Sequence, residues 1–301
     1  MAGQQMHADE IPTDAQLVRR LVAAQFPQWA ELPVSAVDSA GTDNALFRLG
    51  PDLVARLPRI HWAATLADKE YEWLPALAPQ LPLAVPVPVA KGSPADGYPW
   101  SWTVCTWLDG RNPAPENLTD PQAVAEALAR FIRALHEIDP AGGPPAGERN
   151  FFRGVPLAMR DAWTRPSIEE VRDEFDPEAV GAAWDAALQA DPWPEPPLWV
   201  HGDLSPGNLL VTDDRLSAVI DFGGLGVGDP ACDLVVAWNL FADGARETFR
   251  AAMRVDDSTW ARGRGWALST ALVALPYYRD TNPVLAANSR YVIAAVLADQ
   301  P

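Results

Sequence analysis

The segment HGDLSPGN at residues 201–208 gathers polar side chains directly after a short apolar run. Asp203 and Asn208 lie in this segment, and Asp221 follows a second short strand-like run at residues 217–220. Carboxylate and carboxamide oxygens at the ends of buried strands suit Mg²⁺, which favours one or two carboxylates together with phosphate oxygens. If Asn208 and Asp221 are the metal ligands, Asp203 is left to act as a base.

The spacing of these residues gives a second argument. His201, Asp203 and Asn208 form the pattern H-x-D-x-x-x-x-N, and Asp221 opens an Asp-Phe-Gly sequence thirteen residues after Asn208. This order matches the catalytic loop and the Asp-Phe-Gly motif of kinases. The longer string HGDLSPGNLLV…VIDFGGLGVGDPACDL resembles the aminoglycoside phosphotransferase (APH) family, which shares the kinase fold and phosphorylates small molecules.

Two details favour this family over protein kinases. Residue 202 is glycine where protein kinases have arginine, and the sequence DPACDL follows at residues 229–234. About nine residues separate Asp221 from the next predicted helix, too few for an extended activation segment that binds a polypeptide. The resemblance extends from about Gly41 to Leu234.

The resemblance implies a role for each matching residue. Asp203 would accept or orient the proton of the substrate hydroxyl, while Asn208 and Asp221 would hold magnesium on the nucleotide phosphates. His201 would be structural, and Asp233 resembles the buried acid that braces the catalytic loop in this family. The alternative is that Asp203 and Asn208 only close a tight turn.

Kinase-like enzymes also need a cation on the third strand and a helix glutamate that holds it. The two lysines of the chain, Lys69 and Lys91, lie outside the predicted strand. Arg56 stands at the position of the family's cation, and Glu70 is its expected partner. Arginine keeps the charge and adds a planar fork of donors. Glu72 remains open as the helix acid, and Arg56 could instead be an ordinary salt-bridged strand residue.

Two further segments are expected to bind the nucleotide. No glycine-rich G-x-G-x-x-G sequence precedes the predicted cation strand. The loop from Ser39 to Asn44 resembles the family's shorter nucleotide loop and would cover the phosphates with backbone N–H groups. A hinge is expected near residues 106–110, where backbone groups of Thr106 and Leu108 would meet adenine.

The predicted elements place these residues on a small sheet followed by a helical region. Strands are expected at residues 45–49, 53–57 and 98–108, and a helix carrying Glu70 at residues 64–78. Thr13 is expected to cap an earlier helix, and Asp120 to start a long one. The chain is expected to be helical from about residue 231 onward.

These elements predict an α+β protein with a bilobal, protein-kinase-like fold. A length of 301 residues exceeds the usual single core, so two lobes are expected. The small β-rich N-lobe, residues 1–109, would hold five strands and bind the nucleotide. The larger helical C-lobe, residues 110–301, would hold the catalytic loop, the magnesium site and the acceptor site.

Charge and composition limit the partners. A net charge of −17 opposes nucleic acid and anionic lipid, whose binding depends on lysine and arginine. The most apolar segment, LPLAVPVPVA, is interrupted by prolines and is too short to span a membrane. The chain has two cysteines, Cys105 and Cys232, and its N-terminus shows no export signal. We therefore expect a cytoplasmic enzyme without nucleic-acid or membrane partners.

The expected reaction transfers the γ-phosphate of ATP or GTP to a hydroxyl of a small molecule. An aminoglycoside-type antibiotic is the first acceptor expected, because residues 110–301 carry 28 acidic and 16 basic side chains and would attract a polycation. A macrolide kinase and a metabolic small-molecule kinase remain alternatives. A non-catalytic pseudokinase is a further one, supported by Arg56 in place of lysine and by the missing glycine-rich loop.

Overall fold

The computed structural model describes residues 10–37 and 43–299, which form two compact units. The first unit extends to Gly110 and includes the segment Ala218–Gly223. The second comprises Arg111–Ser217 and the chain from Gly224 onward. The segment with Asp221 joins the first unit through backbone pairing, since the N–H of Val219 donates to the carbonyl of Ala84 at 3.0 Å.

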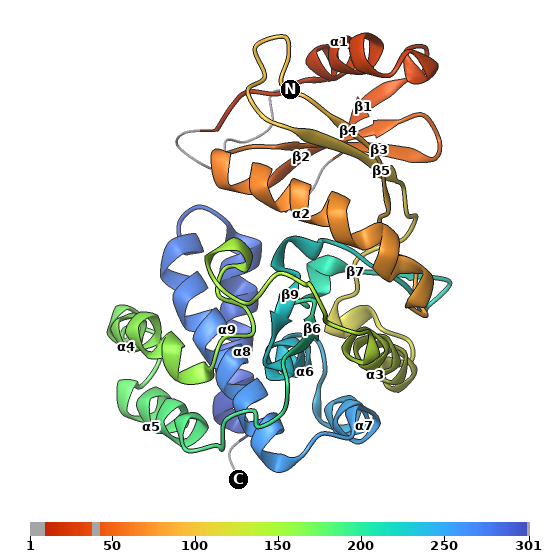
Figure 1. The fold of residues 1–301 in the computed structure, drawn as a ribbon. Helices are drawn as coiled ribbons and strands as arrows, with labels where there is room; N and C mark the ends of the chain where they lie inside the picture. The colour runs from red at the N-terminus through yellow and green to blue at the C-terminus, as the bar shows by residue number, and fades with distance from the viewer. Residues whose placement is uncertain (1–9, 38–42, 300–301) are drawn as a thin grey trace. The chain divides into compact units, whose positions relative to one another are not determined.

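The first unit is built on a five-stranded antiparallel sheet, as the sequence predicted (Figure 1). The strand order is β1-β2-β3-β5-β4. A tight turn joins β2 to β3, and Gly50 in this turn has a φ of +64°, which glycine adopts without strain. The strands are β1 (Val34–Ala36), β2 (Asn44–Leu49), β3 (Leu53–Pro58), β4 (Pro88–Gly92) and β5 (Trp102–Thr106).

Helices lie on both faces of this sheet (Figure 1). On one face, Ala55 and Leu57 of β3 share an apolar core with α1 (Ala15–Gln25). Side chains alternate along a strand, so Arg56 points to the other face, where α2 (His61–Leu77) packs. The burial of β3 on both faces therefore places a charged side chain between the sheet and α2.

The N-terminal cap of α1 differs from the prediction. Asp14, and not Thr13, is the cap residue, and its carboxylate accepts the N–H of Leu17 at 2.7 Å. Aspartate is preferred over threonine as an N-cap residue, so cap propensity already favours Asp14 over its neighbour. The predicted strand at residues 98–108 is also shorter, because the strand of the sheet comprises only Trp102–Thr106.

The second unit is mostly helical. The predicted start of α3 is confirmed, since Asp120 accepts the N–H of Ala123 at 2.9 Å. Helix α8 packs against α4, α5 and α9 (Figure 1). The helices are α3 (Pro121–Glu137), α4 (Asp161–Glu170), α5 (Pro177–Leu188), α6 (Val236–Asn239), α7 (Asp243–Met253), α8 (Asp257–Tyr278) and α9 (Pro283–Ala298).

Four short strands complete the fold. Strand β6 (Leu198–Val200) pairs with β9 (Gly226–Gly228), and β7 (Leu209–Thr212) pairs with β8 (Arg215–Val219). The segment HGDLSPGN connects β6 to β7, so its ends are fixed by two different sheets. Across residues 10–37 and 43–299, no helix combines the length and the apolar character needed to cross a bilayer. The α+β class predicted from the sequence is confirmed.

Candidate active site

The segment after β6 is held by a buried carboxylate. Asp233 is fully buried and accepts the N–H groups of His201 at 3.0 Å and Gly202 at 2.7 Å. The Nε2 atom of His136 lies 3.2 Å from the same carboxylate. Three partners satisfy a charge that would otherwise be costly to bury. The bracing role expected for Asp233 is therefore confirmed, and His136 in α3 supports it.

The backbone at residue 202 requires glycine. Gly202 has a φ of +80°, and a Cβ atom there would lie 2.5 Å from the carbonyl oxygen of Gly224. The backbone of Asp203, the next residue, is also fixed, because its N–H donates to Nδ1 of His201 at 3.2 Å. The segment thus presents Asp203 from a backbone that is tied down at consecutive residues.

The Asp203 carboxylate remains accessible, with 46% of its side chain exposed. Nδ2 of Asn208 donates to Oδ2 of Asp203 at 3.1 Å and to its backbone carbonyl at 2.8 Å. This arrangement leaves Oδ1 of Asn208 as the amide atom that can bind a cation. The structure therefore brings Asp203 and Asn208 together, as the spacing predicted.

In the first unit, Arg56 forms a buried ion pair with Glu70. Two guanidinium nitrogens engage both carboxylate oxygens, one of them at 3.2 Å. Glu70 is only 2% exposed, whereas Glu72 is exposed, so Glu70 is the helix acid. Burial by itself would lower the pKa of Arg56, but the carboxylates of Glu70 and Asp221 raise it above its usual value. The guanidinium therefore stays charged.

Asp221 lies beside this pair with an unusual backbone. Its φ is +63°, a conformation that is uncommon for non-glycine residues and is often found at functional sites. Its Oδ1 is 4.0 Å from Nη2 of Arg56, and 36% of its side chain is exposed. Lys69, which sequence analysis did not single out, is buried in α2 and donates to the carbonyl of Gly223 at 2.7 Å. Lys69 thus anchors the Asp-Phe-Gly segment to the helix that carries Glu70.

The expected magnesium ligands have the right chemistry. Oδ1 of Asn208 and the carboxylate of Asp221 are the hard oxygen donors that Mg²⁺ prefers, with phosphate and water completing its shell. Within the described residues, no group of three or more His, Cys, Asp or Glu side chains forms an all-protein metal cage. Each of these two side chains is therefore, by its chemistry, a donor that suits Mg²⁺ bound to phosphate.

The other predicted nucleotide contacts are less defined. Residues 39–42 of the predicted phosphate loop lie outside the described residues, and Asn44 begins β2 opposite Pro58. The N–H of Thr106 is used within the sheet, where it donates to the carbonyl of Val87 at 3.0 Å. The backbone of Leu108 forms no hydrogen bond with any described residue. Leu108 is therefore the better placed of the two to donate to a base.

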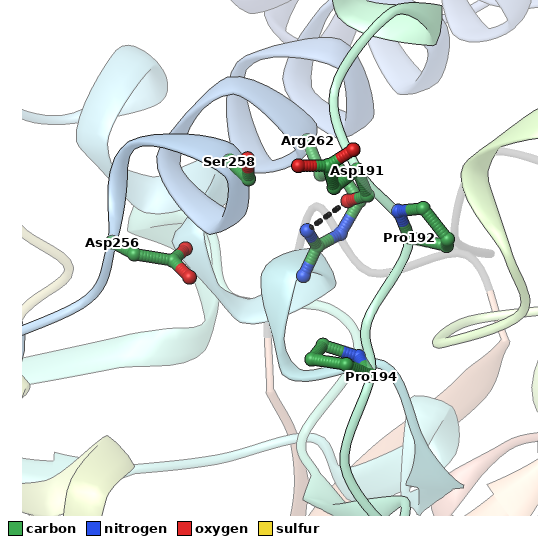
Figure 2. Close-up of a pocket in the computed structure, with 6 residues that line it drawn as sticks. All are labelled: Asp191, Pro192, Pro194, Asp256, Ser258 and Arg262. Carbon is green, nitrogen blue, oxygen red and sulfur yellow. Dashed lines mark hydrogen bonds between the residues drawn. The ribbon is translucent and has the colours of Figure 1, made fainter.

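A pocket of about 390 Å³ in the second unit is lined by none of the predicted site residues (Figure 2). Its arginine, Arg262, is buried and already satisfied. It pairs with Asp229 at 2.8 Å and donates to the carbonyl of Asp191 at 2.6 Å. The remaining lining residues are Pro192, Pro194, Asp256 and Ser258. This pocket therefore plays no part in the candidate active site.

The first unit is an antiparallel five-stranded sheet with a cation paired to a glutamate. The second unit is helical and presents an aspartate and an asparagine from one braced loop. This arrangement is typical of kinase-like phosphotransferases. Comparison of sequences agrees with this class. The chain belongs to the phosphotransferase enzyme family, which it matches over residues 36–266.

Similar proteins cover part or all of the chain. An aminoglycoside 3'-phosphotransferase from Escherichia coli is 32% identical over 150 residues, covering 46% of this chain and 52% of that protein. A homoserine kinase from Beijerinckia indica is 34% identical over 142 residues, covering 45% and 40%. The chain thus spans about half the length, or less, of the curated relatives it matches.

Solved structures match over nearly the whole chain. The GDP complex of aminoglycoside 2'-phosphotransferase-IIIa aligns with a TM-score of 0.72 at 19% identity, covering 95% of this chain and 99% of that one. A macrolide 2'-phosphotransferase from Brachybacterium faecium aligns with a TM-score of 0.63 at 25% identity, covering 96% and 99%. The first likeness establishes the kinase-like fold.

Proposed function

We propose that this protein transfers the γ-phosphate of ATP or GTP to a hydroxyl group of a small molecule. The observation that carries the proposal is that the Asp203 side chain is accessible while its backbone is held in place. Its carboxylate is accessible, yet the loop beneath it is fixed by the buried Asp233. A base that is rigid and exposed is what proton transfer from an incoming hydroxyl requires.

Each remaining group has a role in this proposal. Asp203 takes or orients the hydroxyl proton, and Asn208 keeps its carboxylate in place. Arg56, held by Glu70, binds nucleotide phosphate oxygens. Asn208 and Asp221 would hold magnesium through Oδ1 and the carboxylate, and the ion would supply positive charge that neutralises the phosphates.

The donor nucleotide is proposed from two observations. The backbone N–H of Leu108 donates to no described residue, so it can donate to a ring nitrogen of a purine base. Structures of relatives are named as complexes with GDP and with ATP. We propose that the loop from Ser39 to Asn44 covers the phosphates and that residues 106–110 act as the hinge. Cys105 and Cys232 are both free and buried, in keeping with a cytoplasmic enzyme.

The acceptor is proposed from the names of the relatives. Aminoglycosides are named most often, and the excess of acidic side chains from residue 110 onward would attract such polycations. Macrolides and homoserine are also named. One contact supports a homoserine-type acceptor as a second candidate. The cationic Arg153 lies 3.4 Å from Asp203, and homoserine has a carboxylate that an arginine can bind.

The test is a transfer assay with purified protein, Mg²⁺ and labelled ATP or GTP. Aminoglycosides, macrolides and hydroxy amino acids are supplied separately, and phosphorylated products are identified by mass spectrometry. We expect acceptor-dependent phosphate transfer that disappears in Asp203→Ala. Equal nucleotide hydrolysis by the wild type and Asp203→Ala, with no product from any acceptor, would favour the pseudokinase alternative.

A further inference from the structure

A positive side chain, that of Arg153, lies beside Asp203 within the second unit. Arg153 places Nη2 3.4 Å from Oδ1 of Asp203 and donates through Nη1 to Oγ1 of Thr270 at 2.9 Å. Its Nε is buried without a hydrogen-bond partner. Arg153 is therefore held beside the proposed base, but its hydrogen-bonding capacity is not filled.

Arg160, a few residues further on, is buried without an acidic partner. It is only 7% exposed, and its Nε donates to Oγ of Ser269 at 3.0 Å. Its guanidinium lies 5.5 Å from the ring centre of Trp163 and 5.1 Å from that of Trp266. Its two terminal nitrogens donate no hydrogen bond to any described residue.

This lack of a partner sets Arg160 apart from the other buried arginines of the described chain. Arg56 pairs with Glu70, Arg246 with Asp299 and Arg262 with Asp229. A buried cation without a counter-ion is expensive. Burial, reinforced by the positive charge of Arg153, lowers the pKa of Arg160 to about 9. An anion bound beside Arg160 would offset both the cost of burying its charge and the repulsion from Arg153.

We infer that Arg153 and Arg160 bind an oxyanion, a carboxylate or a phosphate, on the acceptor whose hydroxyl is phosphorylated. The inference rests on the proposed function, because it assigns the acceptor of that same site. A guanidinium donates to a carboxylate or phosphate through two parallel hydrogen bonds. Arg153 pairs with Asp203 at 3.4 Å, so an acceptor oxyanion would take over Arg153 and leave Oδ1 of Asp203 for the hydroxyl.

The pair would also disfavour acceptors that carry ammonium groups near the reacting hydroxyl. Ammonium groups close to the reacting hydroxyl would meet two guanidiniums, and like charges reject a ligand as effectively as good contacts select one. Local charge therefore favours hydroxy acids and sugar phosphates over polycations, although the surrounding unit is acidic overall. This is the opposite of what the net charge suggests.

The experiment uses matched acceptors that differ in one group. Gluconate and glucitol share a six-carbon polyhydroxy chain, but only gluconate has a carboxylate. Binding of each to the full-length protein is measured by calorimetry without nucleotide, and transfer is measured with ATP or GTP and Mg²⁺. The variants are Arg153→Gln, Arg160→Gln and, as a matched control on the exposed face of α3, Arg130→Gln.

We expect the wild type and Arg130→Gln to bind gluconate at least about tenfold more tightly than glucitol, since a charged hydrogen-bonded pair is worth about 1.5–3 kcal/mol. Arg160→Gln and Arg153→Gln should lose this preference, and any effect on transfer should fall mainly on the KM for gluconate. Equal binding of the two compounds, or a preference that survives in Arg160→Gln, would overturn the inference. A preference for an aminoglycoside over gluconate would overturn it as well.

The two proposals fail in different ways. If gluconate binds through Arg160 but no compound with a hydroxyl is ever phosphorylated, the oxyanion site stands and the proposed transferase function falls. If transfer to an acceptor occurs and is indifferent to Arg153→Gln and Arg160→Gln, the transferase function stands and the oxyanion site falls.

Discussion

The chemistry proposed for Asp203 depends on one ionised carboxylate. Asp203→Asn keeps the size and the hydrogen-bonding reach of the side chain but removes the base. We expect kcat for transfer to fall by about 10²- to 10⁴-fold, the usual contribution of a positioned base. Initial rates at saturating nucleotide measure the loss.

A matched substitution separates this effect from damage to the fold. Asp213→Asn changes an exposed turn residue with positive φ, a conformation that asparagine tolerates. Both variants should unfold at the wild-type temperature. If Asp203→Asn kept full activity, Asp203 would have no role as a base.

The Arg56–Glu70 pair makes a prediction about stability. Removing one partner of a buried ion pair leaves the other charge unpaired, which costs about 3–5 kcal/mol. We expect Arg56→Gln to lower the free energy of unfolding by that order, as measured by urea denaturation. The double variant Arg56→Gln with Glu70→Gln should recover part of the loss, because neither charge of the pair is then left without its partner. Equal losses in the single and double variants would show that the two charges are not coupled.

At the scale of elements, substitution by alanine should have opposite effects on stability at two glycines. A methyl group at Gly202 would collide with the carbonyl of Gly224, in a backbone with a φ of +80°. At Gly181, inside α5, a methyl group meets nothing within 4 Å. We expect Gly202→Ala to destabilise the protein and to lower kcat by displacing Asp203. Gly181→Ala should stabilise the protein by about 0.5–1 kcal/mol, through better helix propensity, without affecting kcat.

Thermal unfolding and transfer rates of the two variants check this prediction. A stabilised Gly181→Ala protein shows that added methyl groups are not harmful in themselves. Normal activity in Gly202→Ala would mean that the loop tolerates a shifted backbone at residue 202.

Elements whose signals are local could be predicted from the sequence. The cap at Asp120, the turn between β2 and β3, and the polar loop between β6 and β7 are each specified by residues a few positions apart. The motif also identified Asp233, because its distance from the loop along the chain is part of a known pattern. The cap, the turn and the loop could be predicted because neighbouring residues alone decide their geometry, whereas Asp233 was found only through the motif.

Contacts between distant segments could not be predicted. Lys69 meets Gly223, and Arg153 meets Asp203, across separations of 154 and 50 residues. Neither arginine of the proposed oxyanion site belongs to a motif, and no feature of the sequence distinguishes these two from the other arginines of the chain. The sequence could only have warned that the net charge of a unit does not give the charge near the acceptor, because an acceptor contacts individual side chains.

At the scale of the whole molecule, the proposed nucleotide and magnesium binding makes a prediction about the stability of the full chain. Asp221 and Arg56 belong to the first unit, whereas Asn208 belongs to the second. A ligand that binds only the folded protein stabilises it by about 2.7 kcal/mol at 100 times its Kd. We therefore expect ATP or GTP with Mg²⁺ to raise the unfolding temperature of the full chain.

The metal dependence of this stabilisation identifies the ligands. We expect most of the shift to vanish when a chelator replaces Mg²⁺, because phosphate oxygens then lose their bridge to the protein. Asp221→Asn and Asn208→Ala should each reduce the Mg²⁺-dependent part of the shift, although the two residues belong to different units. Asp213→Asn should retain the full shift. If only one of the two ligand variants loses the Mg²⁺ effect, the other residue is not a metal ligand, and that part of the proposal is wrong.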